Sequence, residues 1–423
     1  MSITTIRGFH DILPGEVEKW QFVETAAREV FENFNFSEVK IPVLEKTELF
    51  ARSIGDTTDI VEKEMYTFLD RKGESLTLRP EATASVARSY IEHKLYKTDP
   101  VAKFYFLGPM FRYERPQKGR FRQFHQINAE SFGVASPKMD GEIISLALCF
   151  FRKVGLTDLE LQINSLGCPR CRTEFMAELK NYLKDKIADL CNDCQRRAEV
   201  NPLRTLDCKK KECREIVFNA PSILDYLCED CSDHFQELKQ FLTSLEIAYH
   251  VNPKIVRGLD YYTRTTFEII SSRLGSQDAV AGGGRYDNLV SKLGGPDTPA
   301  VGFAIGWERL VSLLTREDKK FIRPLQLFIA ALGKDASKEA YKLLNNLRLS
   351  GIKSEMSYHG KSLKSQMRRA DKMNSRFVLI LGDEEFKFKK AILRDMSDKS
   401  QENIDLKEVV SEVKKRLGGT LSD

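Results

Sequence analysis

The sequence predicts an α+β main body that is interrupted by a helical insertion and followed by a small α/β domain with a mostly parallel sheet. Side chains from 111 to 130 alternate as in two β-strands joined by a loop, which favours an antiparallel sheet in the main body. From Cys168 to about Leu245, strand patterns give way to charged helical segments that contain eight of the nine cysteines. After Pro324, apolar strands alternate with amphipathic helices.

Chain length and composition limit the number of domains and indicate the cellular compartment. A chain of 423 residues is too long for one hydrophobic core, so two or three domains are expected. We place the main body at 1–167 and 246–320, the insertion at 168–245 and the C-terminal domain at 325–423. The sequence shows neither the apolar stretch of a signal peptide nor a run that could span a bilayer, so we expect a cytoplasmic protein without membrane contact.

The main body begins with a helix, because apolar residues recur at helical spacing over 17–34. The elements expected next are, in chain order, an extended piece at 37–45, a helix at 47–55, strands at 64–70 and 75–79, a helix at 81–95, a strand at 101–107, the strand–loop–strand segment, and a helix at 138–154 that stops at Gly155. After the insertion, strand patterns return at 256–270, 278–290 and 301–306, and the last one continues into a helix.

The C-terminal domain follows a charged linker at 315–324 and is basic. Strands are expected at 325–332, 352–359 and 377–382, and helices at 334–350, 362–373 and 404–417. From 324 to 423 there are 20 Lys and Arg against 14 Asp and Glu, a net charge of +6, which leaves −1 on the first 323 residues. A basic domain of this kind suits contact with a polyanion, although a chance excess of this size is common.

The cysteines of the insertion fall into four closely spaced pairs, namely Cys168 with Cys171, Cys191 with Cys194, Cys208 with Cys213, and Cys228 with Cys231. Disulfides are rare in a reducing cytoplasm, whereas paired thiols of this spacing match structural zinc, which is four-coordinate. One zinc ion accepts two Cys-x-x-Cys pairs, and the candidate ligands are Cys191, Cys194, Cys228 and Cys231. The alternative is a set of reduced thiols that bind no metal.

The segment from 111 to 130 combines charged strands with a basic loop. Arg112 and Glu114 share one face of its first predicted strand, and a polar face of the second carries Arg122, Phe124, Gln126, Asn128 and Glu130. Across 112–125 there are five basic residues, including Arg115, Lys118 and Arg120 of the loop, against one acid. This local excess suits phosphate groups. The alternative is an exposed hairpin with a solubilising tip.

Phosphate binding here would depend on arginine side chains, because the usual glycine-rich loops are missing. The GKS at 360–362 lacks the earlier glycine of a P-loop, and AGGGRYD lacks the spacing of a dinucleotide fingerprint. Three arginines stand beside small or polar residues, at Arg112, Arg257 and Arg309. A fixed guanidinium can bind an α-phosphate with two hydrogen bonds and stabilise charge that builds up in a transition state. Each of them, taken alone, is more often a surface or salt-bridging residue, and it is their joint occurrence that points to phosphate binding.

These segments resemble the class II aminoacyl-tRNA synthetases, and most closely the histidyl-tRNA synthetases. The similarity lies in VKIPVLEKTELF with Pro42, in GPMFRYERPQKGRFRQFHQ, in AVGFAIGWERL, and in the segments RGLDYYTRTTFE and AGGGRYD. The resemblance implies a catalytic core on an antiparallel sheet, a homodimer formed through the first motif, and an anticodon-binding domain at 325–423. It also implies ATP-dependent activation of L-histidine and transfer of the histidyl group to tRNA(His).

The resemblance also implies roles for individual residues. The implied ATP-binding residues are Arg112, Glu114 and Arg309, with Mg²⁺ on the pyrophosphate. The implied histidine-binding residues are Glu81, Thr83, Arg112, Gln126, Glu130, Arg257, Tyr261 and Tyr262, and the implied catalytic residues are Arg112 and Arg257. An imidazole needs a flat aromatic slot and a partner for each ring nitrogen, which phenols and a carboxylate can supply. Strand packing is the alternative role for the two tyrosines. His125 alternates away from this face, so no histidine receives a catalytic role.

Two other functions compete with this interpretation. The regulatory subunit of ATP phosphoribosyltransferase resembles the same catalytic core, but it lacks an anticodon-binding domain and typically loses the arginines that this chain keeps. A zinc-dependent nucleic-acid-binding module would explain the cysteines and the basic C-terminal domain. It would leave the three arginines and the paired tyrosines unexplained.

Overall fold

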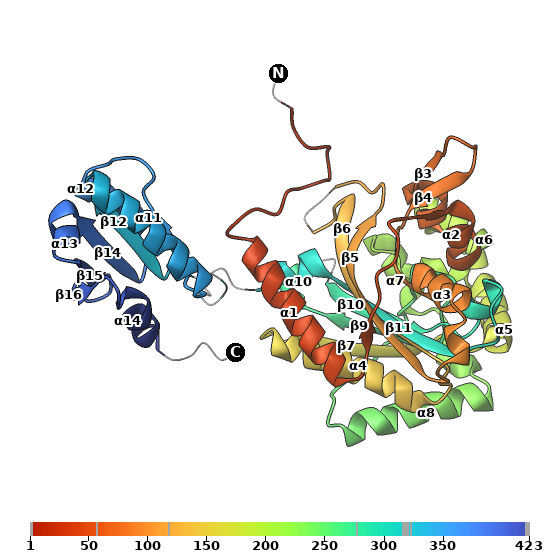
Figure 1. The fold of residues 1–423 in the computed structure, drawn as a ribbon. Coiled ribbons are helices and arrows are strands. Elements are labelled where there is room, and N and C mark those ends of the chain that lie inside the picture. Colours follow the sequence, from red (N-terminus) through yellow and green to blue (C-terminus); the bar gives the residue numbers. More distant parts are fainter. Residues whose placement is uncertain are drawn as a thin grey trace. The chain divides into compact units, whose positions relative to one another are not determined.

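The structure is a computed structural model that describes residues 3–55, 58–116, 119–275, 278–314, 321 and 324–418 (Figure 1). The chain divides into two compact units, Met1–Asp318 and Lys319–Asp423. Of the expected linker at 315–324, only Phe321 and Pro324 are among the described residues, and Lys118 of the expected basic loop is also outside them. Within the described ranges, no helix combines the length and the apolar character that a membrane crossing needs.

The first unit is built on an eight-stranded sheet. Its strands are, in spatial order, β1 (Ser37–Glu38), β5 (Ala102–Phe111), β6 (Gln123–Phe132), β11 (Ala300–Gly306), β10 (Ala279–Arg285), β9 (Thr263–Ile270), β7 (Glu160–Ser165) and β8 (His250–Val251). The six central strands pair antiparallel, and only the short edge strands β1 and β8 pair parallel with their neighbours. The predicted antiparallel core is therefore confirmed.

Long helices cover one face of this sheet (Figure 1). They are α1 (Val17–Asn33) and α4 (Pro137–Lys153), with α10 (Trp307–Leu313) at the end of β11. Phe31 of α1 packs edge-on against Tyr105 of β5, Phe150 of α4 and Phe303 of β11, at ring-centroid distances of 5.3, 5.8 and 6.0 Å. The first helix is amphipathic because the apolar side chains along one side of it are buried against the sheet. After α4 the chain turns at Gly155, whose φ is +86°.

The other face of the sheet carries shorter elements and the residues of the predicted site. They are α2 (Thr47–Ile54), α3 (Thr83–Glu92), α9 (Leu289–Lys292), the one-turn elements η1 (Ile60–Glu64) and η2 (Leu95–Lys97), and a three-stranded sheet of β2 (Leu44–Lys46), β4 (Ser75–Leu78) and β3 (Tyr66–Leu69). The one-turn element η6 (Ser272–Leu274) instead contacts α10, where Arg273 Nη1 donates to the Leu313 carbonyl at 3.2 Å. Tyr90 of α3 stacks on Phe132 of β6 at 4.6 Å, which fixes this helix over the sheet.

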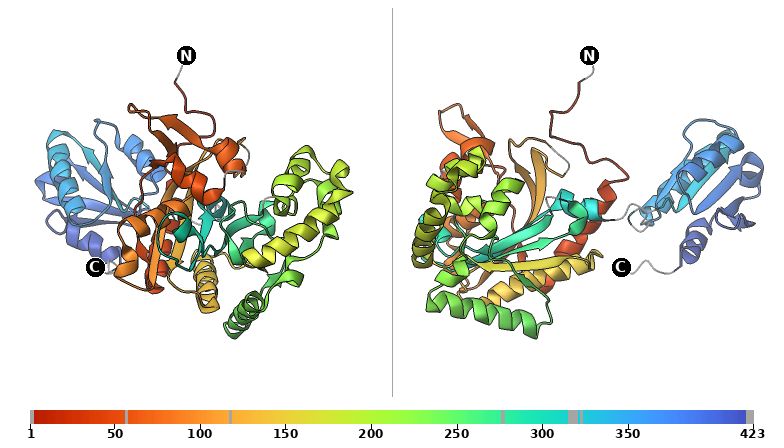
Figure 2. Two further views of the ribbon diagram at one scale, coloured as in Figure 1. Left: turned by 90° about the vertical axis from the view of Figure 1, so that its right-hand side faces the viewer. Right: turned by 180° about the vertical axis from the view of Figure 1, so that it is seen from behind.

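The insertion is helical, as predicted from its sequence, and forms a lobe at one side of the sheet (Figure 2). It contains α5 (Pro169–Lys184), η3 (Ile187–Asp189), α6 (Asn192–Val200), η4 (Pro202–Thr205), α7 (Lys211–Phe218), η5 (Ile223–Tyr226) and α8 (Glu229–Ser244). Phe175, Leu179 and Leu183 of α5 form a small core with the cysteines of α6 and α7. In contrast, α8 packs on α4 of the main body, where His234 contacts Asp140.

The C-terminal unit is a five-stranded sheet with helices on both faces. Its strands are, in spatial order, β13 (Ser354–Met356), β12 (Leu327–Leu332), β14 (Phe377–Gly382), β15 (Lys390–Asp395) and β16 (Gln401–Asp405), and its helices are α11 (Lys334–Leu349), α12 (Leu363–Lys372), α13 (Asp383–Lys387) and α14 (Val409–Arg416). The three predicted strands pair parallel, as expected. The structure adds the antiparallel strands β15 and β16, whose charged, half-exposed sequence hid the strand pattern.

Two segments that were predicted as strands are loops at the site. The first strand of the 111–130 segment lies upstream, because β5 ends at Phe111 and its partner β6 begins at Gln123. The chain leaves the sheet at Tyr113, because the N–H of this residue donates to the Glu64 carbonyl at 2.6 Å and not to a carbonyl of β6. Similarly, residues 256–262 precede β9 as irregular backbone. Arg112, Glu114 and Arg257 therefore project from loops.

Candidate active site

A cavity of about 710 Å³ opens on the face of the sheet that the long helices leave uncovered. Its walls come from β6, β10 and β11, from the loop after β5, from the segment before β9 and from the insertion. The predicted site residues that line it are Glu81, Thr83, Arg112, Glu114, Gln126, Arg257, Tyr261, Tyr262 and Arg309. Residues that are distant in the sequence, including all three arginines, thus share one cavity large enough for a bound nucleotide.

Arg112 is fixed from two sides at the mouth of the loop after β5. Its Nε donates to the Pro80 carbonyl at 2.9 Å, and its guanidinium lies over the Phe124 ring at 5.2 Å. The neighbouring Glu114 carboxylate is almost fully buried and pairs with Arg120 Nε at 2.5 Å. Because one edge of the Arg112 guanidinium is held by the backbone, its remaining N–H groups keep a defined direction for a phosphate.

Arg309 projects from α10 into the same cavity. Its Nη1 donates to the Ala279 carbonyl of β10 at 2.7 Å. Burial, followed by the positive charges of Arg120 and Arg112, lowers the pKa of Arg309, although Glu114 acts in the opposite direction. The guanidinium groups of Arg112, Arg120 and Arg309 are therefore close enough to influence one another. Together they create a positive potential that a bound polyanion would neutralise.

Arg257 also lines the cavity and is held by a carboxylate. Its guanidinium forms an ion pair with Glu268 of β9 and lies 5.9 Å from the centroid of the Tyr262 ring. Burial by itself lowers the pKa of Arg257, but the charge and hydrogen bond of Glu268, together with Tyr262 and Asp207, make the net shift upward. Gly282 of β10 makes room, because a Cβ there would lie 2.6 Å from Arg257 Cζ. Arg257 therefore remains a fixed cation.

Two buried carboxylates stand beside Thr83 at the start of α3. Glu81 accepts the backbone N–H groups of Thr83 and Ala84 at 2.7 and 2.8 Å, and Glu130 accepts the Thr83 hydroxyl at 2.7 Å. Burial raises the pKa of both acids, and that of Glu130 reaches about 8. This end of the cavity therefore favours a cation, such as an ammonium group, beside its acids.

Glu130 lies behind the cavity wall and not on it, which differs from the expected position. Its side chain is almost fully buried, and both oxygens are occupied by the hydroxyls of Thr83 and Tyr286. Gly302 on the neighbouring strand leaves the space that this carboxylate fills, since a Cβ at that position would overlap it. Thr83 thus separates Glu130 from the cavity.

Aromatic rings and amides complete this end of the cavity. The Tyr261 and Tyr262 rings lie 4.8 Å apart, and Tyr286 meets Tyr261 edge-on at 5.6 Å. Gln126 and Asn128 follow one another on the cavity-facing side of β6. Among the described residues, the buried side-chain oxygens of both amides have no hydrogen-bond partner. Unpaired buried acceptors that share the cavity with Tyr261 and Tyr262 form a slot that suits a flat ligand with N–H donors.

The sequence interpretation left out several residues that shape the cavity. Glu268 and Tyr286 belong to the two segments singled out by resemblance, and Asn128 lies between Gln126 and Glu130 on the predicted polar face. The insertion adds residues that no sequence signal connected with the site, namely Arg197, Arg204, Asp207, Lys209 and Lys210. His125 is not among the lining residues, and its ring instead contacts Glu308 at 3.0 Å, in agreement with its expected orientation.

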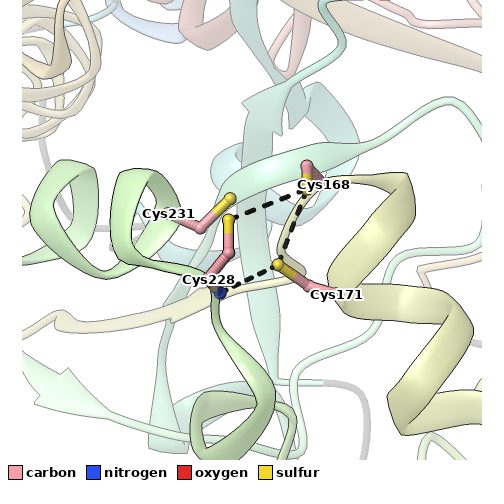
Figure 3. A group of neighbouring side chains, drawn as sticks. All are labelled: Cys168, Cys171, Cys228 and Cys231. Atoms are coloured by element: carbon pink, nitrogen blue, oxygen red, sulfur yellow. Dashed lines mark hydrogen bonds between the residues drawn. The ribbon is translucent and has the colours of Figure 1, made fainter.

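The predicted zinc quartet of Cys191, Cys194, Cys228 and Cys231 is wrong in its grouping. The structure gathers Cys168, Cys171, Cys228 and Cys231 in one group (Figure 3), and Cys191, Cys194, Cys208 and Cys213 in a second. The reason is helix packing, because α5 and α8 begin side by side and bring their own cysteine pairs together. Sequence spacing identifies the pairs but not which pairs meet.

Comparison with known proteins identifies the family. Residues 8–310 match the family model described as Histidyl-tRNA synthetase, and residues 326–416 match the model described as Anticodon binding domain. The chain belongs to the histidyl-tRNA synthetase family. The resemblance first seen in the sequence motifs is thereby confirmed.

Individual histidyl-tRNA synthetases match almost the whole chain. The histidine–tRNA ligase of Geobacter sulfurreducens is 56% identical over 404 residues, which cover 96% of this chain and 97% of that protein. The histidine–tRNA ligase of Thermodesulfovibrio yellowstonii is 50% identical over 421 residues, with coverage of 98% and 99%. The crystal structure of apo S. aureus histidyl-tRNA synthetase has a TM-score of 0.82 and 36% identity, covering 98% of this chain and 100% of that one.

Proposed function

We propose that this member of the histidyl-tRNA synthetase family is a histidine–tRNA ligase that forms histidyl-adenylate from L-histidine and ATP and transfers the histidyl group to the 3′ end of tRNA(His). The observation that carries this proposal is the convergence of Arg112, Arg257 and Arg309 in one cavity, next to a slot lined by tyrosines and buried acids. A triphosphate and an amino acid need such neighbouring, oppositely charged subsites.

Activation of histidine requires positioning and charge stabilisation rather than a general base. The histidine carboxylate is already ionised, and one of its oxygens forms a bond to the α-phosphorus while the bond to pyrophosphate breaks. Arg112 and Arg257 approach this phosphorus from different walls of the cavity and offset the charge that develops there. Arg309 holds the far end of the nucleotide, and Glu114 lies beside Arg112 to receive the adenine.

Mg²⁺ would enter as part of the ATP complex and neutralise the departing pyrophosphate. Mg²⁺ keeps several waters and needs only one or two carboxylates from the protein. Glu64 and Glu114 both line the cavity, and burial together with the charge of Glu114 raises the pKa of Glu64. A divalent cation held by Glu64 would relieve this repulsion and leave Glu114 for the adenine, so Glu64 is a donor that fits the ion.

Histidine recognition follows from the polar groups at the closed end of the cavity. The α-ammonium group fits beside Glu81, Thr83 and the unpaired oxygen of Gln126. The imidazole fits the slot of Tyr261 and Tyr262, with Glu130 acting through the hydroxyl of Thr83. A side chain without ring nitrogens would leave the buried oxygen of Asn128 in this cavity without a donor, which is a strong basis for rejection.

The same proposal places the enzyme as a cytoplasmic homodimer that contacts tRNA through its basic C-terminal unit. Apolar side chains of the small sheet and of the residue before it are exposed, with Val43, Leu44, Phe68 and Leu69 at 40, 41, 46 and 68%. Such a patch supports dimerisation through the segment around Pro42. The regulatory-subunit alternative is disfavoured, because this chain keeps both the three arginines and a unit that matches the anticodon-binding model.

Charging of tRNA(His) with labelled histidine tests this proposal directly. The full chain is expected to charge tRNA(His) and to leave tRNAs of other specificities uncharged. Removal of 324–423 is expected to abolish charging while histidine-dependent ATP–pyrophosphate exchange continues, because the cavity lies wholly in the first unit. Unchanged charging by the shortened chain would refute the assigned role of the C-terminal unit.

A further inference from the structure

We propose that the insertion contains two separate structural zinc sites, one in each cysteine quartet, and that the second site holds the wall of the catalytic cavity next to Arg257. The first site consists of Cys168, Cys171, Cys228 and Cys231, and the second of Cys191, Cys194, Cys208 and Cys213. Eight of the nine cysteines of the chain are used in this way.

The first quartet has the geometry of a four-thiolate site (Figure 3). Cys168 Sγ lies 3.6 Å from Cys171 Sγ and 4.0 Å from Cys228 Sγ, and all four sulfur atoms lie within 4.8 Å of one another. A tetrahedron of zinc–sulfur bonds of about 2.3 Å has edges of about 3.8 Å. One ion at the centre therefore matches the observed spacing, whereas a cluster of several metal ions would need more widely spaced sulfurs.

The second quartet repeats this arrangement. Cys191 Sγ lies 4.0 Å from Cys208 Sγ, and its four sulfur atoms also lie within 4.8 Å. Cys194 and Cys213 are fully buried, and Cys208 is 8% exposed. Without an ion, four thiols would fill part of the small core of the insertion, although the described core cluster contains only nine other buried residues, one of which, Val256, lies outside the insertion.

Both sites share a local design that favours thiolates. Cys168, Cys191 and Cys228 each occupy the N-cap position of a helix, where the helix dipole stabilises negative charge. In each quartet a backbone N–H crosses to a sulfur of the other pair, from Cys228 to Cys171 Sγ at 3.1 Å and from Cys191 to Cys213 Sγ at 3.2 Å. Such N–H to sulfur bonds orient ligands around a metal. Four-thiolate tetrahedral sites of this kind select zinc.

The second site connects to the catalytic cavity through the segment between its ligands. Cys194 and Cys208 bracket η4, and Arg204 of η4 donates to the backbone carbonyl of Arg257 at 3.0 Å. In the same segment Asn201 donates to Asp260 at 3.1 Å. Cys191 and Cys208 themselves line the cavity. The first site has no ligand among the lining residues, so loss of the second ion should disturb catalysis more than loss of the first.

Metal analysis of the purified full-length chain tests the stoichiometry. We expect about two zinc ions per chain in the wild type, and about one in each double variant, Cys171→Ser with Cys231→Ser and Cys194→Ser with Cys213→Ser. Cys149→Ser is the matched control, because Cys149 is exposed and belongs to neither quartet, and it should retain both ions. A metal-free wild type, or iron in place of zinc, would overturn the assignment.

Cobalt substitution tests the geometry without any mutation. Co²⁺ in place of zinc in the wild type should give the strong visible bands of tetrahedral thiolate coordination, with two equivalents bound per chain. Weak octahedral bands would contradict the four-thiolate sites.

Histidine-dependent ATP–pyrophosphate exchange then separates the roles of the two sites. Each double variant is assayed only when it retains one zinc ion, since the remaining ion shows that the insertion is folded. The kcat of the second-site variant should fall at least about ten-fold, whereas that of the first-site variant should stay within about three-fold of wild type. Equal losses in both variants would refute the link between the second site and Arg257.

Discussion

Gly282 faces the guanidinium of Arg257 so closely that a Cβ at position 282 would lie 2.6 Å from Arg257 Cζ. The absence of a side chain at this point of β10 leaves room for Arg257, for which we propose a catalytic role, to pair with Glu268. The position of Arg257 therefore depends on Gly282, a residue without a side chain that takes no part in the proposed chemistry.

Replacing Gly282 with alanine should displace Arg257 without removing its charge. A misplacement of about 1 Å can cost about 100-fold in rate, and we expect a loss of this order in kcat for histidine-dependent exchange. The control is Gly360→Ala, where a Cβ would meet no described heavy atom within 4 Å. Wild-type rates in the Gly282→Ala variant would show that Arg257 can shift freely.

Gln126→Leu should weaken histidine binding more than catalysis. The buried oxygen of Gln126 lacks a partner in the described part of the chain and faces the subsite proposed for the α-ammonium group. A hydrogen bond to a charged group contributes about 1.5–3 kcal/mol, so the Kd for histidine should rise about 10- to 100-fold in calorimetry. Gln123→Leu, on the opposite face of β6, serves as the control and should leave the Kd unchanged. Equal affinities would remove Gln126 from the ammonium site.

Glu130→Gln should remove a pH dependence of stability. Burial raises the pKa of Glu130 from 4.5 in the unfolded chain to about 8 in the fold. Below pH 4.5 Glu130 is protonated in both the folded and the unfolded chain. Between pH 4.5 and about 8 it ionises only in the unfolded chain, so the free energy of unfolding falls as pH rises through this window. The wild type should lose up to about 1.4 kcal/mol per pH unit more than the variant.

Tryptophan fluorescence during urea unfolding measures this difference selectively. The two tryptophans of the chain, Trp20 and Trp307, both lie in the first unit, so the signal reports the unit that contains Glu130. The two stability curves should converge below pH 5 and separate by pH 8. Parallel curves over this range would mean that Glu130 is ionised in the fold.

Asp140→Ala should destabilise the first unit, because the buried Arg285 would lose its fully buried carboxylate partner and keep only the partly exposed Asp287 at 3.2 Å. Asp140 accepts bonds from Arg285 at 2.5 Å, Thr265 at 2.5 Å and His234 at 2.8 Å, and both charged side chains of the Asp140–Arg285 pair are fully buried. Removing one partner of such a pair costs about 3–5 kcal/mol in the free energy of unfolding.

An exposed ion pair provides the matched control for this change. Asp158 pairs with Arg273 at 3.0 Å, but its side chain is 56% exposed, so Asp158→Ala should cost less than about 1 kcal/mol. Tryptophan fluorescence during urea unfolding compares the two variants. Similar losses in both would show that the buried network adds nothing beyond a surface pair.

The sequence predicted the fold well where one face of an element is buried. The helical spacing of α1 and the strand–helix transition at Gly306 reflect burial on the sheet, and both lie where they were expected. The pattern failed where charge conceals a strand, as in β15 and β16, and where a loop carries alternating side chains by coincidence, as in the residues after Phe111.

The sequence allowed those site residues to be predicted whose type and neighbours alone indicate their chemistry. Arg112, Arg257 and Arg309 stand out by type and context, and the structure brings them to one cavity. The contribution of Arg204 was not predictable, because it depends on how the insertion packs against the main body. The same limit applies to the two cysteine quartets. Each cysteine pair can be recognised from its sequence spacing, but which two pairs come together depends on the tertiary packing of the helices.

Histidine-dependent ATP–pyrophosphate exchange, measured for the wild type and for Arg112→Ala, Arg257→Ala and Arg309→Ala, tests the central claim most directly. We expect exchange with histidine and with no other amino acid, and a loss of about 100-fold or more in kcat/KM for each variant, because each removes a fixed cation from one triphosphate site. Exchange that another amino acid supports equally well, or that survives loss of these arginines unchanged, would contradict it.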